Sequence, residues 1–174
     1  MKLGEKTLSS EMIYEGKIVK LEKQKVELPN GRISSREIVR HGEAVAILPI
    51  DQDGNLLLVE QFRKPIDKVI LEIPAGLVEP GEEPAQAAAR ELEEECGVVA
   101  GKLEFVVKYY TTPGFSDEMI YLFRATDLKP SQQNMDTDEF LNVVSMPVEE
   151  FKRKVLAKEL IDGKTVLAYG FLDT

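Results

Sequence analysis

The stretch Gly76–Val98 reads GLVEPGEEPAQAAARELEEECGV, and the rest of the chain is organised around it. Its first part, residues 76–81, contains two glycines and Pro80, which predicts a loop. Pro84 is tolerated only in the first turn of a helix, and the alanine-rich run after it is strong helix-forming sequence. Gly97 is a typical C-terminal stop, so the pattern predicts one helix that begins near Pro84 and ends before Gly97.

The predicted helix has an apolar face and an acidic face. The apolar residues recur at helical spacing and should form a narrow stripe that packs closely on a sheet: Ala85, Ala88, Ala89, Leu92 and Cys96.

The acidic face carries Glu91, Glu94 and Glu95, whose i, i+3, i+4 spacing brings their side chains together. Like charges at this spacing repel by roughly 0.2–0.5 kcal/mol per pair, so helix stability gives no reason for the arrangement. A divalent cation would remove the repulsion, and clustered carboxylates suit hard ions such as Mg²⁺ or Mn²⁺. The alternative is a solvated acidic face without a function.

Several positions in this stretch match the pattern Gly-x5-Glu-x7-Arg-Glu-aliphatic-x-Glu-Glu-x-Gly-aliphatic without a mismatch: Gly76, Glu82, Arg90, Glu91, Leu92, Glu94, Glu95, Gly97 and Val98. The stretch therefore resembles the signature of the Nudix hydrolases, and so many matched positions disfavour the solvated face. The resemblance implies hydrolysis of a nucleoside diphosphate linked to another moiety. It also implies an α+β fold, the Nudix-type α/β/α sandwich with a mixed sheet, in which this stretch is a loop-helix-loop.

The composition bounds the class of protein. The chain has 174 residues, of which 43% are hydrophobic and 30% are charged, as expected for a globular protein with one good core. The net charge of −9 argues against nucleic acid and anionic membranes as partners. One cysteine, Cys96, and one histidine, His41, exclude an internal disulfide framework and a zinc site with two histidines. We find no apolar signal segment or membrane span and expect a cytoplasmic protein.

The order of the other elements mixes strands and helices. Alternating residues on either side of Pro29-Asn30-Gly31 predict an antiparallel β-hairpin over residues 17–40, preceded by an irregular segment over residues 1–16. Further strands are predicted at 44–50, 56–63, 69–73, 103–110, 119–126 and 140–145. Helices are predicted at 147–157, with Leu156 on its apolar side, and after Asp162 as far as Leu172. This order favours an α+β fold over a doubly wound sheet.

The loop TPGFSDE carries Pro113 sixteen residues beyond Gly97, and this placement resembles the ADP-ribose pyrophosphatase subgroup. The resemblance implies Mg²⁺-dependent hydrolysis of ADP-ribose to AMP and ribose 5-phosphate. Two alternatives stay open: hydrolysis of another nucleoside diphosphate sugar, such as GDP-mannose, and a ligand-sensing module that binds without cleaving. Relatives exchange the N-terminal region across a two-fold axis. We therefore predict an extension over residues 1–41 that dimerises, a Nudix domain over residues 42–174, and a homodimer.

The resemblance also assigns the metal site. Glu91 and Glu95 are the expected main ligands, with Glu94 and the carbonyl of Ala75 completing the set around Mg²⁺, or Mn²⁺ as second choice. Arg90 is expected to orient the glutamates through ion pairs.

Substrate binding is expected from Arg36 and Arg63, because arginine offers paired donors to phosphate, although surface ion pairs explain single arginines equally well. Glu72 and Leu77, on either side of the start of the signature, are also assigned to the substrate.

The general base is expected outside the helix, since a carboxylate that binds metal accepts protons poorly. The acidic loop Asp136-Thr137-Asp138-Glu139 is the best source, and Glu139 is the first choice because its side chain reaches further. Asp136 and Asp138 are the alternatives within the loop, and Glu94 is the alternative outside it.

Overall fold

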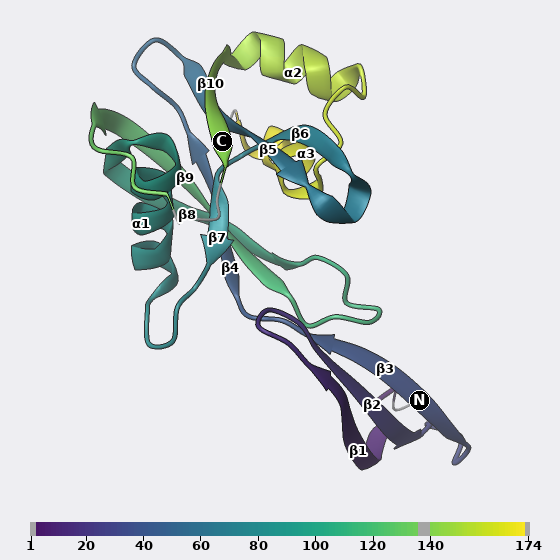
Figure 1. The fold of residues 1–174 in the computed structure, drawn as a ribbon. Helices are drawn as coiled ribbons and strands as arrows, with labels where there is room; N and C mark the ends of the chain where they lie inside the picture. The colour runs from purple at the N-terminus through teal and green to yellow at the C-terminus, as the bar shows by residue number, and fades with distance from the viewer. Residues whose placement is uncertain (1–2, 136–139, 173–174) are drawn as a thin grey trace. The chain divides into compact units, whose positions relative to one another are not determined.

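The computed structural model describes residues 3–135 and 140–172 (Figure 1). It divides into two compact units, which we describe separately. The first unit combines the chain up to Glu43 with Tyr109–Ile120, and the second combines Ala44–Lys108 with the chain from Tyr121 onward.

The first unit contains a three-stranded antiparallel sheet in the order β1-β2-β3, formed by β1 (Lys6–Glu15), β2 (Lys20–Glu27) and β3 (Ile33–Arg40). Strands β2 and β3 pair from Lys20 opposite Arg40 to Glu27 opposite Ile33, so the predicted hairpin is present.

The expectation that residues 1–16 are irregular is wrong, because Lys6–Glu15 forms β1 and makes the extension a three-stranded sheet rather than a hairpin. Every residue of β1 is exposed, so no buried face imposes an alternation of apolar and polar residues on this strand. The backbone pairing with β2 defines the strand instead, and hydropathy patterns do not detect such pairing.

Loop 111–118, which carries Pro113, is tied to β3 within the first unit. The Val39 amide donates to the Phe115 carbonyl at 2.8 Å. The Asp117 carboxylate accepts from Arg40 Nη1 at 3.0 Å and from the His41 amide at 2.9 Å. The loop therefore has a defined backbone position despite its breaker-rich sequence.

The second unit contains the remaining strands in two sheets. One sheet has the order β10-β5-β6 and the other has the order β7-β4-β9-β8. The strands are β4 (Ala44–Pro49), β5 (Asn55–Arg63), β6 (Lys68–Glu72), β7 (Ala75–Leu77), β8 (Val98–Tyr110), β9 (Met119–Pro130) and β10 (Leu141–Pro147). The helices are α1 (Pro84–Cys96), α2 (Val148–Leu156) and α3 (Gly163–Ala168), with short 3₁₀ turns at Lys64–Ile66 and Tyr169–Phe171.

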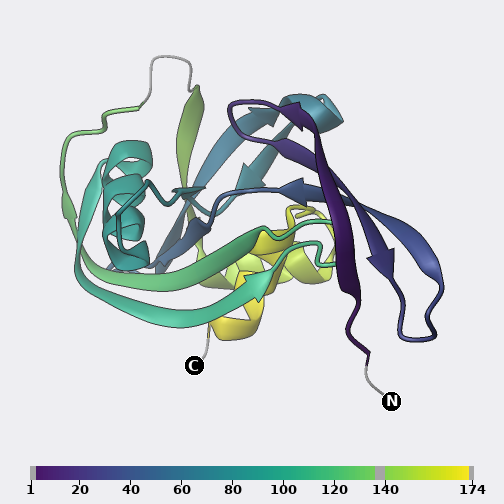
Figure 2. The same ribbon diagram turned by 90° about the horizontal axis from the view of Figure 1, so that it is seen from below.

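The helices of the second unit cover the strands from two sides. Helix α1 contacts β4, β7 and β5, whereas α2 contacts β10 and β5. Figures 1 and 2 both show α1 on one side of β4, with α2 and α3 on the other. This layering confirms the predicted α+β class.

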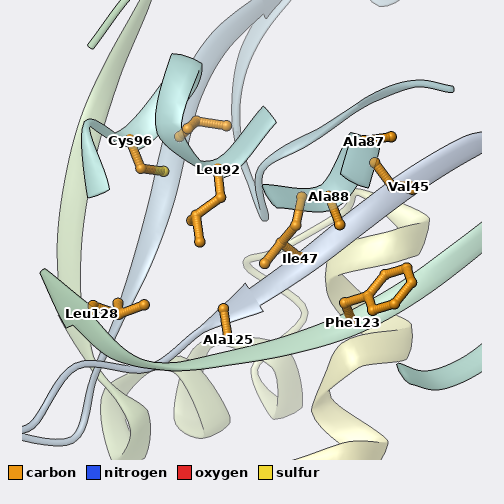
Figure 3. Close-up of a cluster of buried hydrophobic side chains, with 10 residues drawn as sticks. Val45, Ile47, Ala87, Ala88, Leu92, Cys96, Phe123, Ala125 and Leu128 are labelled. Atoms are coloured by element: carbon orange, nitrogen blue, oxygen red, sulfur yellow. The ribbon is translucent and has the colours of Figure 1, made fainter. Parts of the chain in front are cut away.

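The core of the second unit lies beneath α1 (Figure 3). Ala88, Leu92 and Cys96 of α1 face Val45 and Ile47 of β4, and β9 contributes to the same cluster. Burial raises the pKa of the Cys96 thiol to about 12, so Cys96 is a protonated core residue.

The buried face of α1 differs from the predicted stripe by about one residue. Ala85 and Ala89 are exposed, whereas Ala87 is buried. Glu95, at 2% exposure, also lies on the buried face, three residues after Leu92 and one before Cys96. Alanine is tolerated on either face, so a run of alanines marks a helix without marking its orientation.

The ends of the helices follow local sequence. Gly97 adopts the left-handed conformation with φ of 64°, and its amide donates to the Glu93 carbonyl, which ends α1 as predicted. Asp162 caps α3 through the Thr165 amide at 2.9 Å, also as predicted. However, α3 ends at Ala168, before a 3₁₀ turn, and Leu156 of α2 is 69% exposed rather than buried. In the described ranges, no helix is long and apolar enough to cross a membrane.

The orientation of α1 predicts opposite effects for two neighbouring alanines. Ala88→Gln forces a larger polar side chain into a fully buried position, and we expect it to lower the free energy of unfolding by at least about 1–3 kcal/mol. Ala89→Gln should change it by less than about 0.5 kcal/mol, because that position is exposed. Urea denaturation of both variants measures the difference, and equal destabilisation would contradict the observed orientation.

Candidate active site

The candidate site is built from β7, the loop after it and the acidic face of α1. Strand β7 pairs with β4, with Val45 opposite Gly76 and Ala46 opposite Ala75. Since α1 packs on both strands, the glutamates of its inner edge lie next to the β7 backbone. Packing of the fold thus brings the two ends of the signature together.

Arg90 connects the acidic residues of the signature. Its Nε and Nη2 donate to the two oxygens of Glu82 at 3.0 and 2.9 Å, and its Nη1 donates to Glu91 at 2.8 Å and Glu94 at 2.9 Å. A further bond runs from Nη2 to the Leu77 carbonyl at 3.0 Å. The hydrogen bond with Glu82 raises the pKa of Arg90 well above its usual value, against opposing desolvation, and Glu91 and Glu94 add to the increase. Arg90 therefore remains a cation among carboxylates.

Gly76 allows the Glu91 carboxylate to approach the backbone. A Cβ atom at position 76 would lie 2.0 Å from both Cδ and Oε1 of Glu91, which is closer than real Cβ atoms come to another heavy atom. Any other residue type would displace the Glu91 carboxylate from its position against the backbone of β7.

Glu95 is the most buried of the three glutamates on the acidic face of α1, with 2% of its surface exposed. Its Oε2 accepts a hydrogen bond from the Ala75 amide at 3.0 Å. An ionised carboxylate in such a position needs compensating interactions, and the Ala75 amide supplies one of them. The backbone of Ala75 and the side chain of Glu95 are therefore fixed to each other.

The donor set fits a hard divalent cation. It would consist of the carboxylates of Glu91, Glu94 and Glu95 and the carbonyl oxygen of Ala75, all of which are oxygen donors. Gly76, which follows Ala75, lets Glu91 approach the backbone of β7. Within residues 3–135 and 140–172, no three acidic, histidine or cysteine side chains converge as a finished set of metal ligands. Glu91 and Glu94 instead share Nη1 of Arg90.

Arg63 and Glu72, both assigned to the substrate by sequence, bind each other. Arg63 donates from Nε at 2.7 Å and from Nη2 at 2.8 Å to the two Glu72 oxygens. Lys164 of α3 also binds the Glu72 carboxylate. Burial alone would raise the pKa of Glu72, but the Arg63 hydrogen bonds and the charge of Lys164 outweigh burial and lower it. Glu72, at 1% exposure, is thus a buried anion shared by two cations.

The two other predicted substrate residues, Leu77 and Arg36, belong to different units. Leu77 follows Gly76 on β7 and is 41% exposed. Arg36 lies on β3 in the first unit, where its guanidinium binds Glu5 and donates to the Ser35 carbonyl at 2.9 Å. The candidate bases Asp136, Asp138 and Glu139 lie outside the described residues.

Sequence reasoning missed the part of α3 in this site. Lys164 is separated from Glu72 by 92 positions, and a lysine in a short C-terminal helix gives no local signal of that contact. The only clue was the capping residue Asp162, which also binds Lys164 at 3.2 Å.

Comparisons with known proteins identify the family of the chain. The model of the NUDIX domain matches residues 40–167, and the model of the nucleoside diphosphate sugar hydrolase N-terminal domain matches residues 5–39. The chain is 45% identical to the ADP-ribose pyrophosphatase of Bacillus subtilis (strain 168), over 98% of this chain and 93% of that protein. It is 44% identical to the methanol dehydrogenase activator of Bacillus methanolicus, over 97% of this chain and 92% of that protein.

A solved structure is also similar, a crystal structure of an ADP compounds hydrolase. It matches with a TM-score of 0.87 and 28% identity, covering 99% of this chain and 94% of that one. The match confirms the predicted Nudix-type sandwich. With the signature assembled on β7 and α1 and both domain models matched, the chain belongs to the Nudix hydrolase family.

Proposed function

We propose that this protein is a Mg²⁺-dependent ADP-ribose pyrophosphatase that hydrolyses ADP-ribose to AMP and ribose 5-phosphate. The observation that carries the proposal is the group of signature glutamates bound to Arg90, which are Glu82, Glu91 and Glu94, in a chain 45% identical over 98% of its length to the ADP-ribose pyrophosphatase of Bacillus subtilis.

Enzymes of the Nudix family typically use a divalent metal ion. We assign Mg²⁺ to this chain, held by Glu91, Glu94 and Glu95 with the carbonyl of Ala75, because all of these donors are hard oxygens. When bound, the ion supplies positive charge that polarises a phosphoryl oxygen and lowers the pKa of water. The chain itself contributes a buried carboxylate at Glu95, and Arg90 limits the repulsion among the glutamates.

Arg63 is the proposed phosphate ligand in the second unit. Its Nε and Nη2 are engaged by Glu72, and in the described part of the chain its Nη1 has no acceptor. The Arg63 side chain is 41% exposed, so that donor can reach a ligand. Glu72 therefore acts on the substrate by aiming Arg63, while Leu77 beside Gly76 offers an apolar contact.

Glu139 remains our proposed general base, with Asp136 and Asp138 as alternatives. The proposal rests on the need for a carboxylate that does not bind metal and on the acidic sequence at residues 136–139, which precedes β10 in the chain. A cytoplasmic location remains a prediction, supported by the buried free thiol of Cys96.

Hydrolysis of another nucleoside diphosphate sugar is the principal alternative, because the N-terminal model describes hydrolases of that class in general. A module that binds without cleaving is disfavoured by the complete glutamate set. A further candidate is activation of a dehydrogenase, which the 44% identity to the activator of Bacillus methanolicus favours. Addition of the protein to a methanol dehydrogenase assay, with and without Mg²⁺, tests that candidate.

The first unit supports the proposal of a homodimer. Strand β1 is exposed along its whole length, and its apolar residues Leu8, Met12 and Tyr14 are 44%, 49% and 60% exposed. Exposed apolar residues grouped in one small sheet are typical of an interface. We propose that this sheet pairs with a second copy and that Arg36 then acts in the partner's site.

Glu95→Gln should lower kcat by several orders of magnitude while the protein stays folded. The amide oxygen can still accept the bond from Ala75, but the charge that binds the metal is lost. Steady-state kinetics in Mg²⁺ with circular dichroism measures both properties. Glu93→Gln is the matched control, because Glu93 lies on the same helix at a position that the signature leaves open, and it should retain activity. Full activity of Glu95→Gln would refute the metal assignment.

ADP-ribose should give a higher kcat/KM than GDP-mannose or UDP-glucose. Product identification by anion-exchange chromatography should find AMP and ribose 5-phosphate. If another nucleotide sugar is preferred about tenfold, which is about 1.4 kcal/mol of transition-state preference, the alternative substrate class replaces ADP-ribose.

Leu8→Glu combined with Met12→Glu should convert a dimer into monomers in light scattering at micromolar concentration, because charges are costly in an apolar interface. Activity should fall with the loss of the dimer if Arg36 acts across it. Leu156→Glu, at an exposed leucine of α2, is the control and should remain dimeric. An active wild-type monomer would contradict the proposal.

A further inference from the structure

The segment Glu72–Ala75, which leads from β6 into the site, is held at four successive residues. The Glu72 carboxylate binds Arg63 and Lys164, and the Ile73 amide donates to Thr165 Oγ1 at 2.8 Å. The Pro74 carbonyl accepts from the Ile47 amide at 2.9 Å, and the Ala75 amide donates to Glu95. Hydrogen bonds at four successive residues therefore fix the backbone that carries the Ala75 carbonyl.

Two of these four anchors come from the first turn of α3, a helix outside the Nudix signature. Figure 1 shows α3 beside β6, in agreement with the hydrogen bonds to Glu72 and Ile73. Thr165 is fully buried, and besides accepting from Ile73 it donates through Oγ1 to Asp162 at 2.6 Å. The side chain of Lys164 is 10% exposed and binds both Glu72 and Asp162.

The cap of α3 and the anchors form one connected network. Asp162 Oδ2 accepts from the Thr165 amide and hydroxyl, while Asp162 Oδ1 lies 3.2 Å from Lys164 Nζ. The hydroxyl of Thr165 can accept from Ile73 because its own proton is directed to Asp162. The cap of α3 thus orients the Thr165 hydroxyl so that it accepts from the Ile73 amide, and Ile73 lies two residues before Ala75.

We propose that Lys164 and Thr165 are positioning residues of the active site. Thr165 fixes the backbone before Ala75 and hence the metal site. Lys164 shares the Glu72 carboxylate with Arg63, so it limits how strongly Glu72 binds Arg63 and leaves Arg63 able to reach a phosphate while Glu72 aims it. This inference rests on the proposed function for the roles of the metal and the phosphate. The hydrogen bonds of Lys164 and Thr165 are observed independently of that function.

Thr165→Val tests the metal half of the proposal. Valine has nearly the volume of threonine but cannot accept from Ile73 or donate to Asp162. Loss of such an outer contact weakens metal binding by about 10–100-fold. We expect that loss in Mn²⁺ affinity, measured by electron paramagnetic resonance of free Mn²⁺ without substrate. Thr165→Ser keeps the hydroxyl and should restore most of the affinity.

Lys164→Met tests the substrate half of the proposal and leaves the fully buried Thr165 unchanged. Without Lys164, Glu72 is neutralised by Arg63 alone, so Arg63 should be less available. We expect KM for ADP-ribose to rise about tenfold, which is the change expected when one hydrogen bond to a charged group is weakened. The affinity for Mn²⁺ should stay close to that of the wild type. Lys164→Arg should recover much of the KM. Val166→Thr, on the exposed side of the same helix, is the matched control and should change neither quantity.

Thermal melts separate positioning from stability. If Thr165→Val melts at a lower temperature but binds Mn²⁺ like wild type, or if Thr165→Ser is as impaired as Thr165→Val, the metal half is overturned. If Thr165→Val does not fold, Lys164→Met decides, and an unchanged KM overturns the proposal. Failure of the proposed function looks different: wild-type protein that binds Mn²⁺ but does not cleave ADP-ribose refutes the substrate, while the variant affinities still judge the role of Thr165.

Discussion

Arg90 donates to three carboxylates and one backbone carbonyl, and the local order of the active site depends on this cation. Glu91 and Glu94 both bind its Nη1, while Glu82 takes two of its donors and Leu77 offers its carbonyl. A helix with several glutamates at i, i+3 and i+4 spacing is disfavoured by repulsion unless a positive charge lies among them. Arginine suits this position better than lysine, because its planar fork can serve several acceptors at fixed angles.

The same region depends on close backbone approach. Helix α1 packs its small residues Ala87 and Ala88 against the core, so it lies close to β4 and β7. That closeness brings Glu91 over Gly76 and Glu95 to the Ala75 amide. Larger residues at 87 or 88 would lift the helix and separate the glutamates from the strand. The alanines of the signature region are therefore part of the site geometry, although they carry no chemistry.

Local sequence predicts the features that local physics determines. The start of α1 at Pro84, its end at Gly97, the hairpin of β2 and β3 and the Asp162 cap all follow from the properties of one or a few adjacent residues. The errors concern long-range contacts. Strand β1 exists because β2 pairs with it, and the buried face of α1 is chosen by the strands beneath it.

Within the candidate site, the ion pairs of Arg90 with the helix glutamates could be predicted, because the signature has a rigid spacing. The partnership of Arg63 with Glu72 could not, since an arginine considered singly suits a phosphate and a glutamate considered singly suits a ribose hydroxyl. The contact between Lys164 and Glu72 spans 92 positions and has no periodic signal. Such contacts cannot be predicted from local sequence, because they depend on how the tertiary fold places two distant elements, here β6 and α3.

The buried carboxylates of Glu72 and Glu95 explain why the segment Glu72–Ala75 has hydrogen-bond partners on several elements of the second unit. Glu72 and Glu95 are 1% and 2% exposed, and each would be costly to ionise without partners. Glu72 is compensated by two cations, whereas Glu95 receives an amide hydrogen bond and lies where a metal ion is proposed. Glu72 is thus stabilised by cations of the protein itself, and it acts on the site through the backbone segment that begins with it. Glu95 lies on α1 and is bound to the Ala75 amide, so it acts on the site directly, as a proposed metal ligand. The two buried carboxylates therefore have different roles: Glu72 positions the backbone that leads to Ala75, whereas Glu95 belongs to the proposed donor set itself.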